Sequence, residues 1–175
     1  MVLADNDAAS DSIGRDNRAR RFRRVVAKFV TGVTVVLVDT DQGVHGMTAN
    51  AFMSVSLSPL MVAVSIANHT RTHALLSRPG TPFSVSVLSH DQKILSDAFA
   101  GRLDSSTLSS PFEWVPHGVV IRDAVAWFCC TRGETLLSGD HTITIGRVEA
   151  FAAFDRQPLI FYDRAYRPGF PVEGR

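Results

Sequence analysis

Apolar and polar residues alternate in short runs along most of the chain, and glycine, proline, asparagine and aspartate separate the runs. A period of two is typical of β-strands that bury one face, and a short continuous apolar run suits a fully buried strand. These runs predict strands at residues 33–38, 44–50, 60–67, 83–88, 119–121, 124–131, 141–154 and 159–162. The turn at residues 39–43 predicts that the first two of these strands form a hairpin.

Helical spacing occurs in a few short stretches, which predict helices at residues 18–30, 70–77 and 90–100. In the first, an apolar stripe recurs at the spacing of one helical face, and basic residues occupy much of the rest. The stripe consists of Phe22, Val25, Val26, Phe29 and Val30. The pattern as a whole predicts a mainly β (α+β) domain, barrel-like, with a few short helices. Strands and helices do not alternate and no Gly-x-Gly-x-x-Gly turn follows a strand, which argues against a Rossmann sheet.

A length of 175 residues is typical of a single domain, and 45% hydrophobic residues suffice for one core. We expect a disordered, polar lead-in at residues 1–17, one domain at 18–167 and a tail at 168–175. The net charge of +1 gives no general attraction to nucleic acid, and no segment offers the roughly 18 apolar residues that would span a membrane. Cys129 and Cys130 are adjacent, which suits neither an ordinary disulfide nor a zinc site, so we expect a reducing cytoplasm.

Residues 46–59 are strand-like but carry small or polar side chains at nearly every second position. Thr48, Ala49 and Asn50 leave main-chain groups accessible, and Ser54 extends the polar row. One interpretation is a wall that receives a flat ring with a polar edge, read by main-chain N–H and C=O groups. The other is an ordinary edge strand with a solvent-facing Ser/Thr stripe.

Residues 68–73 join a buried strand to a predicted helix, where unpaired N–H groups attract anions. Thr70 and Thr72 add hydroxyl groups, and Arg71 adds a charge that pairs well with phosphate. The alternative is a plain helix N-cap, with Arg71 in solvent.

Two further features allow a functional and a structural interpretation. His141, preceded by Gly139 and Asp140, can project from a sheet rim toward a pocket, or serve as a structural histidine at a turn. The arginine-rich face of the first helix can bind phosphate, or form a solvated helix face. No Gly-x-Ser-x-Gly nucleophile motif and no zinc-binding histidine spacing accompanies them.

Taken together, the segments resemble the flavin reductase-like family, the reductase components of two-component flavin-dependent monooxygenases. The segments that carry the resemblance, in order, are residues 29–36, 46–50, 54–59, 70–73, 83–88, 139–143 and 158–162. The similarity extends from Phe22 to Tyr166. Ser86 stands where the family pattern usually has asparagine, His69 replaces a common small hydroxyl residue, and the tail after Tyr166 diverges.

The resemblance implies an FMN-binding split β-barrel and a homodimer with flavin near the subunit interface. It implies that residues 46–51 line the isoalloxazine, chiefly through main-chain groups, and that residues 65–72 hold the ribityl chain and phosphate. It places His141, as the catalytic residue, and Tyr166 near the nicotinamide. The expected cofactor-binding residues are Met47, Thr48, Ala49, Asn50, Ala51, Ser54, Ser65, Ile66, Ala67, Thr70, Arg71, Thr72 and Tyr166.

The implied function is reduction of FMN or FAD by NADH or NADPH, with reduced flavin passed to a partner monooxygenase. Hydride transfer between the two cofactors needs no protein nucleophile and no metal, which agrees with the motifs that are absent. Two alternatives are an oxidase or oxygenase that retains its flavin on the same fold, and a nucleic-acid-binding regulator that uses the arginine-rich helix. We expect no nucleic-acid partner and no membrane.

Overall fold

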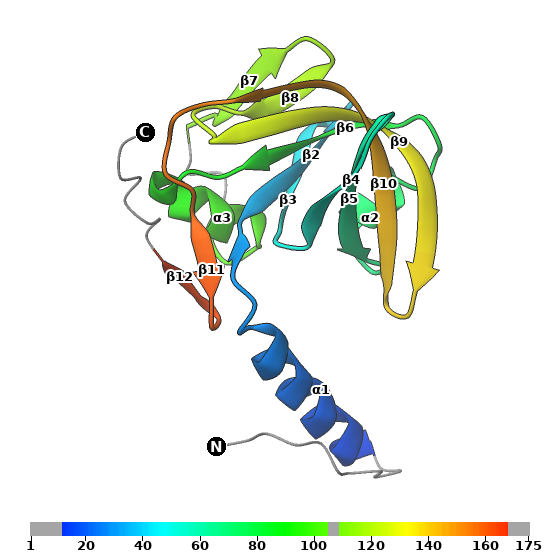
Figure 1. Ribbon diagram of the computed structural model, residues 1–175, viewed down its shortest axis with the longest axis vertical. Coiled ribbons are helices and arrows are strands. Elements are labelled where there is room, and N and C mark those ends of the chain that lie inside the picture. The colour runs from blue at the N-terminus through cyan, green and yellow to red at the C-terminus, as the bar shows by residue number, and fades with distance from the viewer. Residues whose placement is uncertain (1–11, 105–108, 168–175) are drawn as a thin grey trace.

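The computed structural model describes residues 12–104 and 109–167, and within them a mostly β architecture with few helices (Figure 1). The helices are α1 (Ser12–Val26), α2 (Arg71–Leu75) and α3 (Lys93–Phe99), with a 3-10 turn η1 (His90–Gln92) before α3. The strands are β1 (Thr31–Gly32), β2 (Thr34–Thr40), β3 (Gly43–Ala49), β4 (Phe52–Leu57), β5 (Leu60–Ala67), β6 (Pro82–Val87), β7 (Phe112–Val115), β8 (Gly118–Ile121), β9 (Ala126–Ser138), β10 (His141–Ala153), β11 (Ile160–Tyr162) and β12 (Ala165–Arg167).

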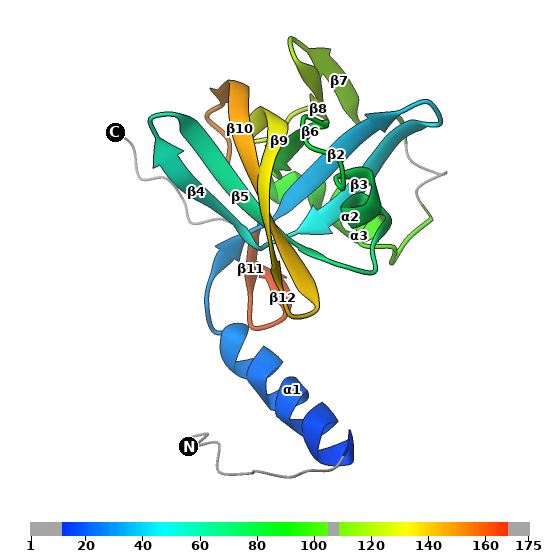
Figure 2. The same cartoon turned by 90° about the vertical axis from the view of Figure 1, so that its right-hand side faces the viewer.

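Seven strands form one antiparallel sheet in the order β3-β2-β6-β9-β10-β5-β4, and the long strands β9 and β10 lie at its centre. The sheet curls strongly, but β3 and β4 remain edge strands, so the barrel is open between them (Figure 2). Two small sheets, β1-β11-β12 and β7-β8, flank it. The predicted fold class is confirmed.

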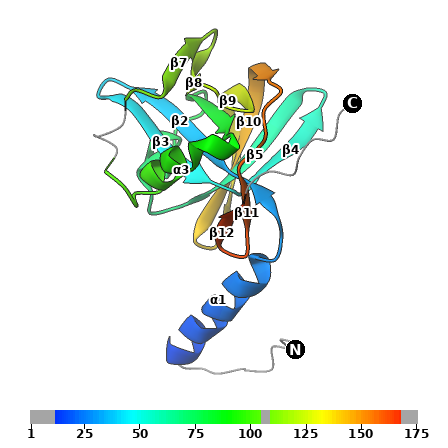
Figure 3. The ribbon, with the colours of Figure 1, turned by 90° about the vertical axis from the view of Figure 1, so that its left-hand side faces the viewer.

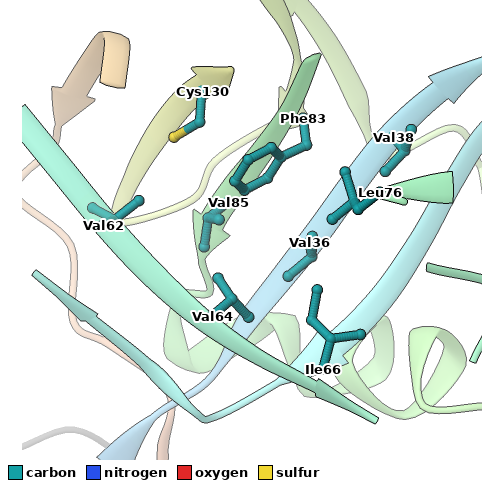
Figure 4. Close-up of a cluster of buried hydrophobic side chains, with 9 residues drawn as sticks. All are labelled: Val36, Val38, Val62, Val64, Ile66, Leu76, Phe83, Val85 and Cys130. Carbon is teal, nitrogen blue, oxygen red and sulfur yellow. The ribbon is translucent and has the colours of Figure 1, made fainter. Parts of the chain in front are cut away.

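Strand β2 carries a continuous apolar run because both of its faces are buried. Val36 and Val38 point into a first core cluster with Val64, Ile66 and Phe83 (Figure 4). The alternate residues Val35 and Leu37, together with Val33 immediately before the strand, belong to a second cluster. Helix α3 packs against this second cluster, and β8 contributes to it. The cluster also contains Leu88, Val119, Ile121, Ala124 and Leu159. The period of two thus divides one strand between two cores.

Helix α1 projects from the body of the molecule, as three views show (Figures 1–3). Its base is held to the β11–β12 turn: Asp163 N–H donates to the Ala27 carbonyl (2.8 Å), and Lys28 Nζ lies 2.8 Å from Asp163 Oδ2. The apolar stripe predicted from the sequence is exposed, with 67% of Phe22 and 74% of Phe29 accessible. The helix starts and ends earlier than predicted, so residues 12–17 are helical rather than part of a disordered lead-in.

Most other predicted elements are confirmed. The β2–β3 hairpin, β5 and β6 lie within a residue or two of their predicted ranges, and η1 with α3 covers the third predicted helix. The second predicted helix shortens to the five residues of α2, and the strand ranges predicted from the sequence did not include β1, β4, β7 and β12. The predicted ends, residues 1–11 and 168–175, lie outside the described residues. None of the described helices is long and apolar enough to span a bilayer.

Candidate functional site

A hollow of about 670 Å³ lies between the segment that follows α1 and the face of the sheet opposite the first core. This volume is within the range of small-molecule sites. Strand register builds its floor, because Ser65 on β5 pairs with Ile143 on β10 and Ala63 pairs with Met53 on β4. We call this hollow the sheet pocket. Its lining residues are Val26, Phe29, Val30, Thr31, Gly32, Thr34, Asn50, Ala51, Phe52, Met53, Ala63, Ser65, Val87 and Ile143.

The segment that joins β3 to β4 is attached to the pocket on both sides. Thr34 Oγ1 on β2 donates to the Ala49 carbonyl (2.7 Å), and the Ser65 N–H on β5 donates to the Ala51 carbonyl (3.0 Å). The exposed side chain of Asn50 lies between these two attachments. The two bonds therefore hold the main chain on either side of Asn50 at the pocket wall.

Thr31, another residue that lines the pocket, carries an unsatisfied polar atom. Within the described residues its Oγ1 is buried and has no hydrogen-bond partner. Buried polar side chains in native proteins are nearly always hydrogen-bonded, so an orphaned hydroxyl at a pocket wall needs an explanation such as a bound molecule.

Three of the residues expected to contact the cofactor line the sheet pocket: Asn50, Ala51 and Ser65. Two more lie further along the same sheet face, because Ala67 pairs with His141 two positions beyond the Ser65–Ile143 pair. Side chains two residues apart in a strand share a face and are separated by about 7 Å. The structure thus brings His141, Ala67 and Ser65 into one row that begins in the pocket. Ser54 is exposed on β4 and does not line the pocket.

The small residues of β3 have a different explanation from the one expected. A Cβ at Gly46 would lie 2.5 Å from Phe99 Cδ1, and Thr48 Oγ1 donates to the Ser96 carbonyl (2.7 Å). Both partners belong to α3. Met47 and Ala49, on the other face of β3, pack against the first core. The small size of Gly46 and the hydroxyl of Thr48 thus accommodate α3, and the side chains of Met47 and Ala49 face the core. Main-chain contact stays a prediction, since β3 is an edge strand.

The prediction that Ile66 and Thr72 contact the cofactor is also corrected. Ile66 is 1% exposed within the first core and Thr72 is fully buried, so neither presents surface to a cofactor. Thr72 Oγ1 instead lies 2.9 Å from His45 Nε2. Burial, and then the positive charge of Arg71, lower the pKa of His45. Ser86 is likewise buried, and its Oγ accepts from the Ile121 N–H (3.0 Å).

The loop before α2 ends in a helix N-cap at Thr70. An N-cap was one of the two interpretations that the sequence allowed for residues 68–73. Thr70 Oγ1 accepts from the His73 N–H (3.2 Å) and donates to the Ala67 carbonyl (2.8 Å). Arg71 is exposed, and its Nη2 donates to Gln42 Oε1 (3.1 Å). The loop therefore displays one guanidinium at the surface, while its threonines stabilise the loop itself.

His141 begins β10 and forms a pair with its neighbour. Its Nδ1 lies 2.7 Å from Asp140 Oδ1, and 45% of the histidine side chain is accessible. A carboxylate accepts, so Nδ1 carries the proton and Nε2 is the ring nitrogen turned away from Asp140. The hydrogen bond from His141, followed by its charge, lowers the pKa of Asp140, and Arg23 of α1 contributes.

Tyr166 on β12 lies outside the sheet pocket, in a polar cluster on α3 that sequence reasoning missed. Its hydroxyl donates to Asp97 Oδ1 (3.0 Å) and lies 2.9 Å from Ser96 Oγ, while Lys93 Nζ lies 5.4 Å from the ring centroid. The hydrogen bond from Lys93 lowers the pKa of Asp97 most, and those from Tyr166 and Arg102 add to it. The i, i+4 spacing of Lys93 and Asp97 was the available signal.

A family model described as the flavin reductase like domain matches residues 26–169 of this chain. The chain belongs to this family. The resemblance inferred from the sequence is confirmed.

Characterised members of the family are similar over most of their length. The NADH-dependent flavin reductase StyB of Pseudomonas fluorescens is 42% identical over 149 residues, which cover 83% of this chain and 86% of that protein. The FMN reductase (NADH) SmoA of Agrobacterium fabrum is 41% identical over 151 residues, with coverage of 85% and 84%.

Solved structures of family members agree with the fold. The styrene monooxygenase flavin reductase of Pseudomonas putida has a TM-score of 0.79 at 39% identity and covers 86% of this chain and 97% of its own. The NADH:FAD oxidoreductase SgcE6 of Streptomyces globisporus, in complex with NAD and FAD fragments, has a TM-score of 0.82 at 31% identity, with coverage of 90% and 96%.

Proposed function

We propose that this chain is an NADH-dependent flavin reductase that binds flavin in the sheet pocket and supplies reduced flavin to a separate monooxygenase. The observation that carries the proposal is the pocket itself: about 670 Å³, mostly apolar, with the main chain of residues 49–51 pinned at its wall. Family membership and the names of the similar reductases support the reaction class.

The residues present fit a flavin. A tricyclic ring needs apolar surfaces for its faces and hydrogen-bonding groups for its polar edge. Phe29, Val30 and Met53 offer apolar surfaces. Asn50 and the Thr31 Oγ1 without a hydrogen-bond partner offer hydrogen-bonding groups. The match between an unsatisfied buried hydroxyl and a ligand with polar ring atoms is the most specific part of this fit.

The remaining roles follow from position. Met47, Thr48 and Ala49 contribute main-chain groups at the free edge of β3. Ala67 extends the row from Ser65 to His141, and Thr70 shapes the loop from which the exposed Arg71 reaches the phosphate. Arginine is well suited to that contact, because its fork of donors matches phosphate oxygens. Tyr166 approaches the nicotinamide from the α3 side.

Hydride chemistry is supplied by the nicotinamide and the flavin when both are bound, so the chain has to bind, orient and shield them. Phe29, Val30 and Met53 supply the apolar surface against which the ring packs. His141 orients the nicotinamide through Nε2, while Asp140 holds its Nδ1 proton. We assign His141 no role as a general base. NADH is the proposed donor, since the similar reductases are named as NADH-dependent.

We further propose a homodimer, located in the cytoplasm. The apolar stripe of Phe22, Val25, Val26, Phe29 and Val30 is exposed on the isolated chain, and three of these residues also line the pocket. A second copy packed on the stripe would bury it and complete the pocket wall. The two cysteines are free and buried, as suits a reducing compartment.

The test measures NADH oxidation by the purified chain with FMN and with FAD, followed at the nicotinamide absorbance band. We expect multiple turnovers with at least one flavin, and a His141→Ala variant that loses more in kcat than in flavin affinity. Absence of turnover with either flavin and either nicotinamide rejects the proposal. Flavin that stays bound through gel filtration would point instead to an enzyme that retains its flavin.

A further inference from the structure

Asn68 connects the β5–α2 turn to the β9–β10 turn immediately before His141. Its main-chain N–H donates to the Asp140 carbonyl (3.0 Å), and its side-chain Nδ2 donates to the Gly139 carbonyl (3.2 Å). Its Oδ1 accepts from Thr142 Oγ1 (2.7 Å). One residue therefore binds both sides of His141 in sequence, the two residues before it and the one after it.

The network continues into α2 with a defined direction. Thr142 is 6% exposed, and its single hydroxyl proton is given to Asn68 Oδ1. The 3.1 Å contact between Thr142 Oγ1 and His73 Nε2 therefore requires that His73 donate from Nε2. Each member has a partner of matching type, which is the condition under which a partly buried polar network is rigid.

An amide is specifically suited to this position. One end of the Asn68 side chain accepts from a hydroxyl and the other donates to a carbonyl. A carboxylate has the same shape but no donor, so it would place an oxygen against the Gly139 carbonyl oxygen. Aspartate would thus keep the bond to Thr142 and replace the bond to Gly139 with a repulsion.

Among the described residues, the His141 ring is hydrogen-bonded to Asp140 alone. Asp140, which holds Nδ1, has 94% of its side chain accessible. The direction of the histidine side chain consequently depends on the main chain of residues 139–142, which Asn68 secures. A hydride donor and acceptor tolerate little misplacement, so a small rotation of this turn would matter for the rate.

We propose that Asn68 is a positioning residue for His141, fixing the turn from which the histidine meets the nicotinamide. This inference rests on the proposed function and on the role assigned there to His141. Asn68 acts through hydrogen bonds to its neighbours and is not itself assigned a contact with either substrate.

The experiment compares Asn68→Asp with wild type, and uses Asn17→Asp as the matched control, since it makes the same chemical change at an exposed position on α1. Kinetics with NADH and FMN are measured for both, together with urea midpoints. We expect Asn68→Asp to lower kcat by about 10- to 100-fold, the cost of misplacing a reacting group, and to raise the KM for NADH. We expect the KM for FMN to change less than twofold, roughly, and the control to match wild type.

The decisive measurement repeats Asn68→Asp in a His141→Ala background. If Asn68 acts through His141, Asn68→Asp should lower kcat in the native protein but hardly at all in the His141→Ala variant, because both substitutions remove the same contribution to the rate. Thr142→Val, which deletes the hydroxyl that bonds Asn68, should show a smaller loss with the same dependence on His141. It serves as the second variant if Asn68→Asp folds poorly.

The outcomes separate the two proposals. A wild-type protein without turnover, or a His141→Ala variant with wild-type kcat, would overturn the proposed function or the histidine's role. A normal His141→Ala loss combined with an unaffected Asn68→Asp variant would overturn the inference about Asn68 alone. So would a loss of equal size in both backgrounds, or one that merely follows the urea midpoint.

Discussion

Replacing Gly46 by alanine tests why the β3 strand carries such small side chains. The added Cβ would lie 2.5 and 2.6 Å from Phe99 Cδ1 and Cε1, and 3.0 Å from Leu37 Cδ2. These separations are below van der Waals contact, so the ring of Phe99 would have to move. Phe99 packs against the second core and lies 6.1 Å, between ring centroids, from Phe112. Its displacement would therefore disturb α3 and the β7 contact together.

The magnitude follows from two opposing effects. Overpacking of this kind costs about 1–3 kcal/mol, whereas replacing glycine by alanine within a strand recovers about 0.5–1 kcal/mol of chain entropy. We expect a net loss in the free energy of unfolding of about 1–2 kcal/mol. For a chain of this size, the melting temperature should fall by about 2–8 °C. Circular dichroism during thermal and urea unfolding measures both quantities.

Two further variants sharpen the measurement. Gly133→Ala, the matched control on β9, meets only the Ile145 carbonyl oxygen at 3.5 Å, so it should be neutral or slightly stabilising. In a Phe99→Ala background only the 3.0 Å approach to Leu37 Cδ2 remains, so Gly46→Ala should cost much less. An equal loss in both backgrounds would refute the steric explanation. An unchanged melting temperature with weakened flavin binding would indicate that Gly46 is small because it faces the cofactor rather than Phe99.

Two other predictions concern acid stability and assembly. The hydrogen bond from Lys93 is the main reason why the pKa of Asp97 lies below its ordinary value of 3.8. Ionised Asp97 therefore stabilises the folded state fully above pH 3.8, and this stabilisation is lost as the pH falls through the lowered pKa. Asp97→Asn should accordingly lower the urea midpoint at pH 7, and its difference from wild type should shrink below about pH 4; a difference independent of pH would contradict the assignment. Phe29→Glu, placed in the exposed apolar stripe, should shift the sedimenting species from dimer to monomer; a monomeric wild type, or an unchanged dimer, would exclude the proposed interface.

The sequence by itself determined the local elements and the family. Alternation with a period of two identified most strands, because burial of one strand face imposes that spacing whatever lies beside it. The same local pattern identified the β2–β3 hairpin and the helix that became α3. Of the residues predicted to bind the cofactor, Asn50, Ala51 and Ser65 line one pocket, and their contact with a cofactor stays a prediction.

Only the tertiary structure decided what each small or polar residue faces. Gly46 and Thr48 have the composition of a ligand wall, but α3, some 50 residues further along the chain, covers them. Asn68 bonds residues 71 and 74 positions away, through contacts that exist only once β5 and β10 pair in register. A side chain's neighbours across a sheet depend on register and layer packing, and neither is encoded in any local window of sequence.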